Sequence, residues 1–189
     1  EKGGDKCLNI DRFRLVLMLW ARGQRNEINI QPVVIDIGKI IHENMAFFEK
    51  LASNKNITLI YDASQSIYAI ADYDMILTVV RNLMANAIKF TYPDGKITIS
   101  CVASDDKIVI SVKDSGVGIT EEDRCNLFKL NTVSKPGTSK EKGSGLGLVL
   151  CKEFVEKNCG EIWVKSELNK GSEFFFSLPK ENFPRIQAT

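Results

Sequence analysis

Apolar residues recur along the chain at two different spacings, which outline the predicted elements. Between residues 73 and 90 they return every three or four positions, the spacing of a helix packed on a core. They are Ile76, Val79, Val80, Leu83 and Ala87. Residues 107–113 are instead rich in isoleucine and valine, which is typical of a mostly buried strand. Helical and strand-like segments therefore follow one another in a single chain.

The same reading outlines the other elements. We expect strands near residues 33–35, 57–61, 67–70, 96–102, 161–166 and 172–178. We expect helices over residues 36–53 and 121–127, and from residue 146. Residues 92–95 form a turn, with proline at its second position and glycine at its fourth.

A first polar cluster lies on the predicted helix 73–90. Steps of four and three place Asn82, Asn86 and Lys89 on one narrow face, beside the apolar stripe. An asparagine carbonyl is a hard-oxygen ligand suited to Mg²⁺, and a lysine one turn further along can meet phosphate as a point charge. The alternative is a solvated helix edge with two incidental asparagines.

A second cluster, Asp114 to Gly118, follows the buried strand 107–113. An ionised carboxylate at a strand end can accept a hydrogen bond from an adenine amino group. Gly116 and Gly118 lack the Cβ atoms that would keep the backbone away from a flat base. Taken alone, such a segment is also compatible with an ordinary turn.

A third cluster, residues 143–148, opens an amphipathic segment, so a phosphate would meet the N-terminus of a helix. The preceding residues 131–142 are polar and contain Pro136 and Gly137, so no strand leads into the glycines and a dinucleotide-binding fingerprint is excluded. We interpret residues 131–142 as a lid, with Lys135, Lys140 and Lys142 available to a triphosphate. An exposed connection is the alternative.

Together, the three clusters resemble a known family. The chain is similar to the C-terminal catalytic and ATP-binding domain of two-component sensor histidine kinases, within the gyrase, Hsp90, histidine kinase and MutL ATPase superfamily. In chain order the matching segments are the N box (82–91), the first glycine box (114–119), the F box (Leu127 and Phe128), the second glycine box (143–148) and the final strand (171–179). The resemblance implies a two-layer α/β sandwich, a mixed sheet with helices on one face.

The resemblance also implies roles for individual residues. It places Mg²⁺ on Asn86, phosphate on Lys89 and adenine on Asp114, with Asn86 and Lys89 as the catalytic pair. The full ATP-binding set is Asn82, Asn86, Lys89, Phe90, Asp114, Gly116, Gly118, Ile119, Lys135, Gly143, Gly145, Leu146, Gly147, Leu148 and Ser172. Many family members carry an arginine after the F box that reaches the terminal phosphate. Lys135 is the nearest cation here that can substitute for it, with a single mobile contact in place of a rigid fork.

The phosphoacceptor of such enzymes is a histidine on a separate dimerisation domain. The one histidine here, His42, lies off the apolar stripe of helix 36–53, and we expect it to be solvent-exposed without a catalytic part. The expected activity is transfer of the γ-phosphate of Mg-ATP to a histidine upstream of this chain. The alternatives are a nucleotide-binding regulatory module without kinase activity, and a related ATPase or serine kinase of the same superfamily.

The N-terminal residues 1–30 have an apolar pattern of their own. Ile10, Phe13, Leu17 and Trp20 alternate steps of three and four, as on one seam of a helical bundle. This stretch resembles the end of the second dimerisation-domain helix with its linker, although a helix packed on its own domain is the alternative. We therefore divide the chain into this segment, a catalytic domain over 31–180 and a tail over 181–189.

Composition sets further limits. The 189 residues are 44% hydrophobic, which suffices for one core and an appended helix, and the net charge of +1 gives no electrostatic case for nucleic acid. The five cysteines have no metal-type spacing and fit reduced cytosolic thiols, and no apolar run approaches the roughly 18 residues of a membrane span. We expect a cytoplasmic domain, anchored to a membrane only through upstream segments. The resemblance implies three partners: the dimerisation and histidine phosphotransfer domain, a response regulator, and a second copy in a homodimer.

Overall fold

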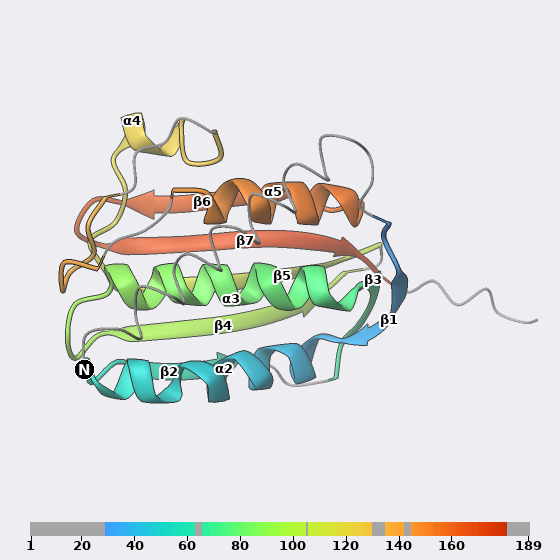
Figure 1. Ribbon diagram of the computed structural model, residues 1–189, viewed down its shortest axis with the longest axis horizontal. Helices are drawn as coiled ribbons and strands as arrows, with labels where there is room; N and C mark the ends of the chain where they lie inside the picture. Colours follow the sequence, from blue (N-terminus) through green and yellow to red (C-terminus); the bar gives the residue numbers. More distant parts are fainter. Residues whose placement is uncertain (1–28, 63–65, 105, 130–134, 142–144, 181–189) are drawn as a thin grey trace, which may run out of the picture.

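The computed structural model describes residues 29–62, 66–104, 106–129, 135–141 and 145–180. A five-stranded sheet in the order β2-β4-β5-β7-β6 spans the domain (Figure 1). Its strands are β2 (Thr58–Asp62), β4 (Lys96–Ala103), β5 (Lys107–Asp114), β6 (Ile162–Glu167) and β7 (Gly171–Pro179). β2 is parallel to β4 and the other neighbours are antiparallel, so the sheet is mixed, as predicted.

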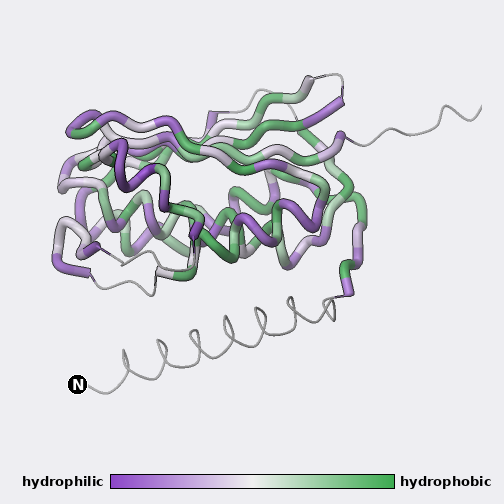
Figure 2. The backbone as a smooth tube through the Cα atoms, turned by 90° about the horizontal axis from the view of Figure 1, so that it is seen from above, coloured by the Kyte–Doolittle hydropathy of each residue, from purple (hydrophilic) through white to green (hydrophobic). Residues whose placement is uncertain are grey.

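Three helices, α2 (Ile37–Ser53), α3 (Tyr73–Phe90) and α5 (Gly147–Lys157), cover one face of this sheet. Figure 2 shows them as a separate layer on one side of the strands. The central helix α3 packs against both α2 and α5. The predicted two-layer sandwich is therefore confirmed, and α3 lies in the middle of it.

Aspartates begin two of these helices. The carboxylate of Asp36 accepts from the amide of Lys39 at the start of α2, and that of Asp72 accepts from the amide of Met75 at the start of α3. Such caps supply an acceptor for one of the four amide groups that lack partners in the first turn of a helix. They explain why the elements begin where the apolar periodicity begins.

The core lies between the sheet and the helices. Alternate strand residues point to one face, so Ile97 and Ile99 of β4 are buried beside Ile110 of β5 and Phe176 of β7. Leu83 of α3 covers them and is fully buried. The opposite face of the sheet carries polar residues together with a stacked aromatic pair, Trp163 and Phe175, whose ring centroids are 5.3 Å apart. One sheet face therefore forms the core, and Trp163 and Phe175 stack against each other on the other face.

Strands β1 (Pro32–Asp36) and β3 (Tyr68–Asp72) form a separate antiparallel pair. The sequence predicted both strands but not their pairing. Ala69 and Ala71 of β3 are fully buried, whereas Tyr68 and Ile70 are exposed, so only one face of this small sheet joins the core. Its inner face closes the sandwich at the end from which α3 begins.

The short helix α4 (Glu121–Arg124) ends earlier than predicted, because we expected it to reach Leu127. After Arg124 the amides of Asn126 and Lys129 donate to carbonyls three residues back, which makes tight turns in place of α-helix. The predicted N-terminal bundle helix and the tail 181–189 lie outside the described residues. In the segments that the structure covers, no helix is long and apolar enough to cross a membrane.

Candidate functional site

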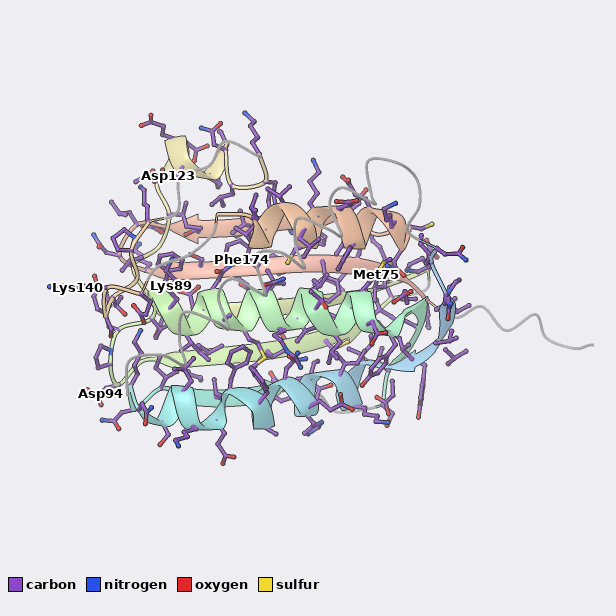
Figure 3. All side chains as sticks on the ribbon, viewed as in Figure 1. Met75, Lys89, Asp94, Asp123, Lys140 and Phe174 are labelled. Atoms are coloured by element: carbon purple, nitrogen blue, oxygen red, sulfur yellow. The ribbon has the colours of Figure 1, made fainter. Side chains whose placement is uncertain are left out.

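The candidate residues of α3 lie toward its C-terminal end. In Figure 3, Lys89 and Lys140 lie at one end of the molecule, and Met75 lies at the other end of α3. Asp114 ends strand β5, and the register pairs it with Ile97 of β4 and with Ser172 of β7. The sheet and the central helix therefore position the first two sequence clusters.

Asp114 is a buried carboxylate, only 4% exposed. The backbone amides of Gly116 and Ser172 both donate to its Oδ1, at 2.8 and 3.3 Å. Burial raises the pKa of Asp114 to about 6, although these two hydrogen bonds favour the ionised form. Because both amides use the same oxygen, Oδ2 is the atom that can accept from a ligand. This orientation suits recognition of an amino group.

The glycines around Asp114 are required by close backbone contacts. A Cβ on Gly116 would lie 2.2 Å from the carbonyl oxygen of Phe90 at the end of α3. A Cβ on Gly171 would lie 2.0 Å from the carbonyl oxygen of Asp114, and Gly171 has a φ of +94°. The amide of Val117 also donates to Phe90 at 3.1 Å. The first glycine box is thus packed directly against the helix that carries the asparagines.

Ser166 of β6 is a residue that the sequence reasoning missed. Its hydroxyl accepts from the amide of Ile119 at 2.8 Å, lies 2.9 Å from the hydroxyl of Ser172, and contacts the carbonyl of Gly171 at 2.9 Å. It therefore ties the first glycine box to the start of β7. The pairing of residues 166 and 172 in the β6–β7 hairpin was the available signal, since a small polar residue faces a predicted site residue there.

Asn82 and Asn86 lie one turn apart on α3, and both are half-buried, beside the core and not within it. The Oδ1 atom of Asn82 lies 3.5 Å from the position that a Cβ on Gly147 would take. Gly147 begins α5, whose N-cap residue Leu146 provides no side-chain hydrogen bond to the first turn. The N-terminus of α5 therefore faces Asn82, with backbone amides suited to an anion.

Lys89 lies in the last turn of α3. Its ammonium donates to the carbonyl of Lys135 at 2.7 Å and lies 4.6 Å from the centre of the Phe90 ring. Partial burial lowers the pKa of Lys89, and the carboxylate of Glu141 opposes this effect. Lys89 and residues 135–141 are thus brought together, and their roles as phosphate-binding lysine and lid stay predictions.

Lys135 was predicted to supply the cation for the terminal phosphate. Its side chain forms an ion pair with Asp123 of α4, and this contact lowers the pKa of Asp123. Its backbone carbonyl contacts the ammonium of Lys89. The side chain is exposed, so a change of partner needs no repacking of the core. The role of Lys135 stays a prediction.

The structure describes some of the other predicted lid residues and not others. Lys140 is exposed and has a φ of +64°, in a turn over residues 137–141. Lys142 and Gly143 lie outside the described residues, as does the first part of the predicted lid, residues 131–134. Gly145, Leu146 and Leu148 are half-buried around the start of α5.

Gly118, in the first glycine box, has a φ of +69° and packs against the backbone of Glu167.

His42 is exposed on α2, as predicted. Its Nδ1 lies 2.7 Å from the carbonyl oxygen of Gly38, and its ring meets Tyr61 edge-on at 5.1 Å between centroids. These contacts join His42 to its own helix and to Tyr61 of β2. His42 is not among the residues that surround Lys89 or Asp114.

The predicted donor for a magnesium ion is the amide oxygen of Asn86. Across the described segments, no group of three or more His, Cys, Asp or Glu side chains is arranged to hold a metal. Mg²⁺ does not require such a cage when a bound phosphate supplies further oxygens. The half-buried Asn86, one turn before Lys89, fits a site of this kind.

The fold and the placement of these residues define a nucleotide-binding domain of the ATPase type. The chain belongs to the family of histidine kinase-, DNA gyrase B- and HSP90-like ATPases, whose model matches residues 71–182. That span runs from the start of α3 to the end of β7, so it includes the three polar clusters that the sequence singled out.

Relatives and solved structures narrow the family to sensor histidine kinases. The adaptive-response sensory kinase SasA of Synechococcus elongatus is 35% identical over 181 residues, which cover 95% of this chain and 46% of SasA. The sensor protein SrrB of Staphylococcus aureus is 28% identical over 177 residues, 93% of this chain and 30% of SrrB. The chain spans less than half the length of these curated relatives.

The catalytic domain of the histidine kinase ThkA superposes with a TM-score of 0.71 at 31% identity, covering 79% of this chain and 96% of that domain. Full-length ShkA, solved in complex with AMPPNP, superposes with a TM-score of 0.77 at 25% identity, covering 89% of this chain and 35% of ShkA. The chain therefore has the fold of a histidine kinase catalytic domain.

Proposed function

We propose that this chain binds Mg-ATP and transfers the γ-phosphate to a histidine on an upstream dimerisation domain in two-component signal transduction. The observation that carries the proposal is the arrangement of Asp114. A buried carboxylate, fixed by two amides on one oxygen, lies beside the end of the helix that bears Asn86 and Lys89. Family membership and the AMPPNP complex of ShkA support it.

Each residue has a distinct part in this proposal. Asp114 accepts from the adenine amino group, while Gly116 and Gly118 let the backbone approach the base. Asn86 holds the divalent cation, which neutralises phosphate charge when bound. Lys89 and the N-terminus of α5 receive phosphate oxygens.

The transfer step is attack by an imidazole nitrogen of the acceptor histidine on the γ-phosphorus, in line with the leaving ADP oxygen. A neutral imidazole needs little proton abstraction, so the domain contributes positioning and charge neutralisation in place of a base. His42 is not the acceptor in this proposal, because it is exposed on α2 and held by contacts to Gly38 and Tyr61.

The proposed partners follow from the relatives. They are the upstream dimerisation and phosphotransfer domain, a second copy of the kinase through that domain, and a response regulator. A solved structure holds ThkA together with the response regulator TrrA, which supports the last of these. We place the domain in the cytoplasm, with any membrane anchor in upstream segments.

One observation favours a second candidate function, a regulatory module that binds nucleotide without transferring phosphate. The cation proposed for the terminal phosphate, Lys135, is paired with Asp123. If that pair persists with nucleotide bound, the γ-phosphate lacks this contact.

Mixing the chain with labelled ATP and a separately expressed upstream domain distinguishes the two functions. Label that appears on that domain and is lost with Asn86→Ala supports the kinase. Binding of nucleotide without any transfer supports the module.

A further inference from the structure

The last turn of α3 is completed by side chains and backbone from other segments. The carbonyl of Ile88 accepts from the ammonium of Lys55 at 2.8 Å, and the carbonyl of Lys89 accepts from the amide of Thr138 at 3.0 Å. The final carbonyls of any helix lack partners within the helix. Here they join α3 to the turn after α2 and to the segment 135–141.

Lys55 is the centre of this junction. Its side chain is only 10% exposed, and its ammonium has close contacts to the carbonyl of Ile88 at 2.8 Å, the hydroxyl of Thr138 at 2.8 Å and the carboxylate of Glu141 at 2.7 Å. An ammonium has three protons, so each has an acceptor. The negative end of the α3 dipole further favours a cation at this position.

The backbone holds Lys55 in place. Lys55 lies in the tight turn that follows α2, where Asn56 has a φ of +53°. The carbonyl of Lys55 accepts from the amide of Asp94 at 3.0 Å, which attaches this turn to the loop before β4. The long side chain thus starts from a fixed point of the scaffold.

Glu141 completes the other half of the contact. One carboxylate oxygen binds Lys55, and the other accepts from the amide of Ser139 at 2.8 Å. Burial disfavours the charged form, but the hydrogen bond from Lys55 and those from backbone amides together lower the pKa of Glu141. Its carbonyl accepts from the amide of Gly137 at 3.0 Å. Glu141 therefore closes the turn 137–141 and attaches it to Lys55.

This turn is packed directly on α3. A Cβ on Gly137 would lie 2.7 Å from the carbonyl oxygen of Lys89, and the hydroxyl of Thr138 contacts the carbonyl of Thr91 at 2.8 Å. Immediately before it, the carbonyl of Lys135 binds the ammonium of Lys89. The position of the turn thus determines which groups surround Lys89.

From these contacts we propose that Lys55 is a positioning residue for nucleotide binding. Lys55, Thr138 and Glu141 form a lid anchor that holds residues 135–141 on the end of α3, so that Lys89 and this segment meet the phosphates in a preset arrangement. Lys55 does not touch the nucleotide, since its protons are already used within the anchor. The inference rests on the proposed binding of ATP.

A different role would be purely structural, as a cap for α3. The two roles differ in what Lys55→Met changes. Loss of a cap lowers the stability of the whole domain, with no particular effect on residues 135–141. Loss of the anchor releases those residues and weakens nucleotide binding through them.

The first test measures Mg-AMPPNP affinity by calorimetry and amide hydrogen exchange for Lys55→Met in the whole chain. We expect affinity to fall about tenfold, and residues 135–141 to exchange faster while β4 and β5 are unchanged. Lys50→Met is the matched control, since Lys50 is an exposed lysine in the last turn of α2. It should leave both measurements unchanged.

The second test is a double-mutant cycle with Glu141→Gln, a lid variant that leaves the core intact. If Lys55 acts through the lid anchor, the affinity of the double variant should equal that of Lys55→Met within about twofold. Thr138→Val should weaken binding in the same direction. Glu141→Gln also keeps the inference testable if Lys55→Met fails to fold.

Two outcomes overturn the inference: unchanged affinity in both Lys55→Met and Glu141→Gln, or losses that add fully in the double variant. Failure of the proposed function is a separate result, because the unmutated chain would then not bind Mg-AMPPNP at all.

Discussion

The amide of Ser172 donates a 3.3 Å hydrogen bond to Oδ1 of Asp114 across strands β7 and β5. The two residues are 58 positions apart in the chain. This bond, together with that from Gly116, turns one oxygen of a buried carboxylate toward the protein. The orientation and burial of Asp114 lead to the first prediction.

Asp114→Asn should reduce the preference for ATP over GTP, because an amide can present its NH₂ group where the carboxylate only accepts. The expected loss of adenine affinity is about 1 to 3 kcal/mol. Calorimetric titration with both nucleotides measures it. Equal binding of ATP and GTP by the unmutated chain would remove Asp114 from adenine recognition.

The raised pKa gives this prediction a dependence on pH. Asp114 has a folded-state pKa of about 6, so ADP affinity should fall as the pH drops below that value and the carboxylate becomes protonated. Asp114→Asn should lack this component of the dependence, while titration of the phosphates affects both proteins alike. Parallel pH profiles for the two would contradict the role of the ionised carboxylate.

The stability of the nucleotide-free domain should depend on pH in the opposite direction to nucleotide affinity. A pKa raised from 3.8 to about 6 means that folding favours the protonated acid. The stability contributed by Asp114 is fully present below pH 3.8 and is lost as the pH rises through about 6. The melting temperature of Asp114→Asn relative to the unmutated chain should therefore increase across this interval, as thermal unfolding can show.

Asn86→Ala should abolish Mg-dependent binding of AMPPNP while the fold survives. Asn86 is half-buried beside the core, so the change in the free energy of unfolding should stay below about 1 kcal/mol. Asn54→Ala, at an exposed asparagine after α2, is the control and should bind normally. Unaltered magnesium dependence in Asn86→Ala would exclude Asn86 as the ligand.

Gly171→Ala should destabilise the domain by about 2 to 3 kcal/mol, because alanine rarely adopts the positive φ of Gly171 and because the new Cβ must displace a neighbouring atom. That neighbour is the carbonyl of Asp114, 2.0 Å from the Cβ position. Denaturant unfolding measures the change. Gly38→Ala is the control, because Gly38 lies in α2 without a left-handed φ and its Cβ would lie 3.2 Å from a side-chain atom, Oδ1 of Asp36, so the loss should be clearly smaller.

The chain alone should bind ATP yet acquire no phosphohistidine, because His42 is exposed and is held by Gly38 and Tyr61. Incubation with γ-labelled ATP, followed by acid that cleaves phosphohistidine, provides the measurement. Acid-labile label that disappears in His42→Ala would identify His42 as the acceptor. It would contradict the proposal that the acceptor histidine lies on an upstream domain.

The amino-acid sequence by itself determined the order and type of the elements and the residues of the polar clusters. These properties are local: the bounds of α3 follow from a three-to-four apolar repeat and from the Asp72 cap, both within one segment. The spacing of Asn82, Asn86 and Lys89 on one helix face is local as well, so it was predictable before any packing was known.

Only the tertiary structure decided which distant groups meet. The contact of Lys55 with Thr138 joins residues 83 positions apart, and Ser166 binds the amide of Ile119 across 47 positions. The first contact depends on the close approach of Gly137 to the carbonyl of Lys89, and the second on strand register and on the close approach of Gly118 to the backbone of Glu167. None of these leaves a periodic pattern in the sequence. For the same reason the sequence did not predict that β1 and β3 pair with each other apart from the main sheet. Strand propensity indicates a strand but not its partner.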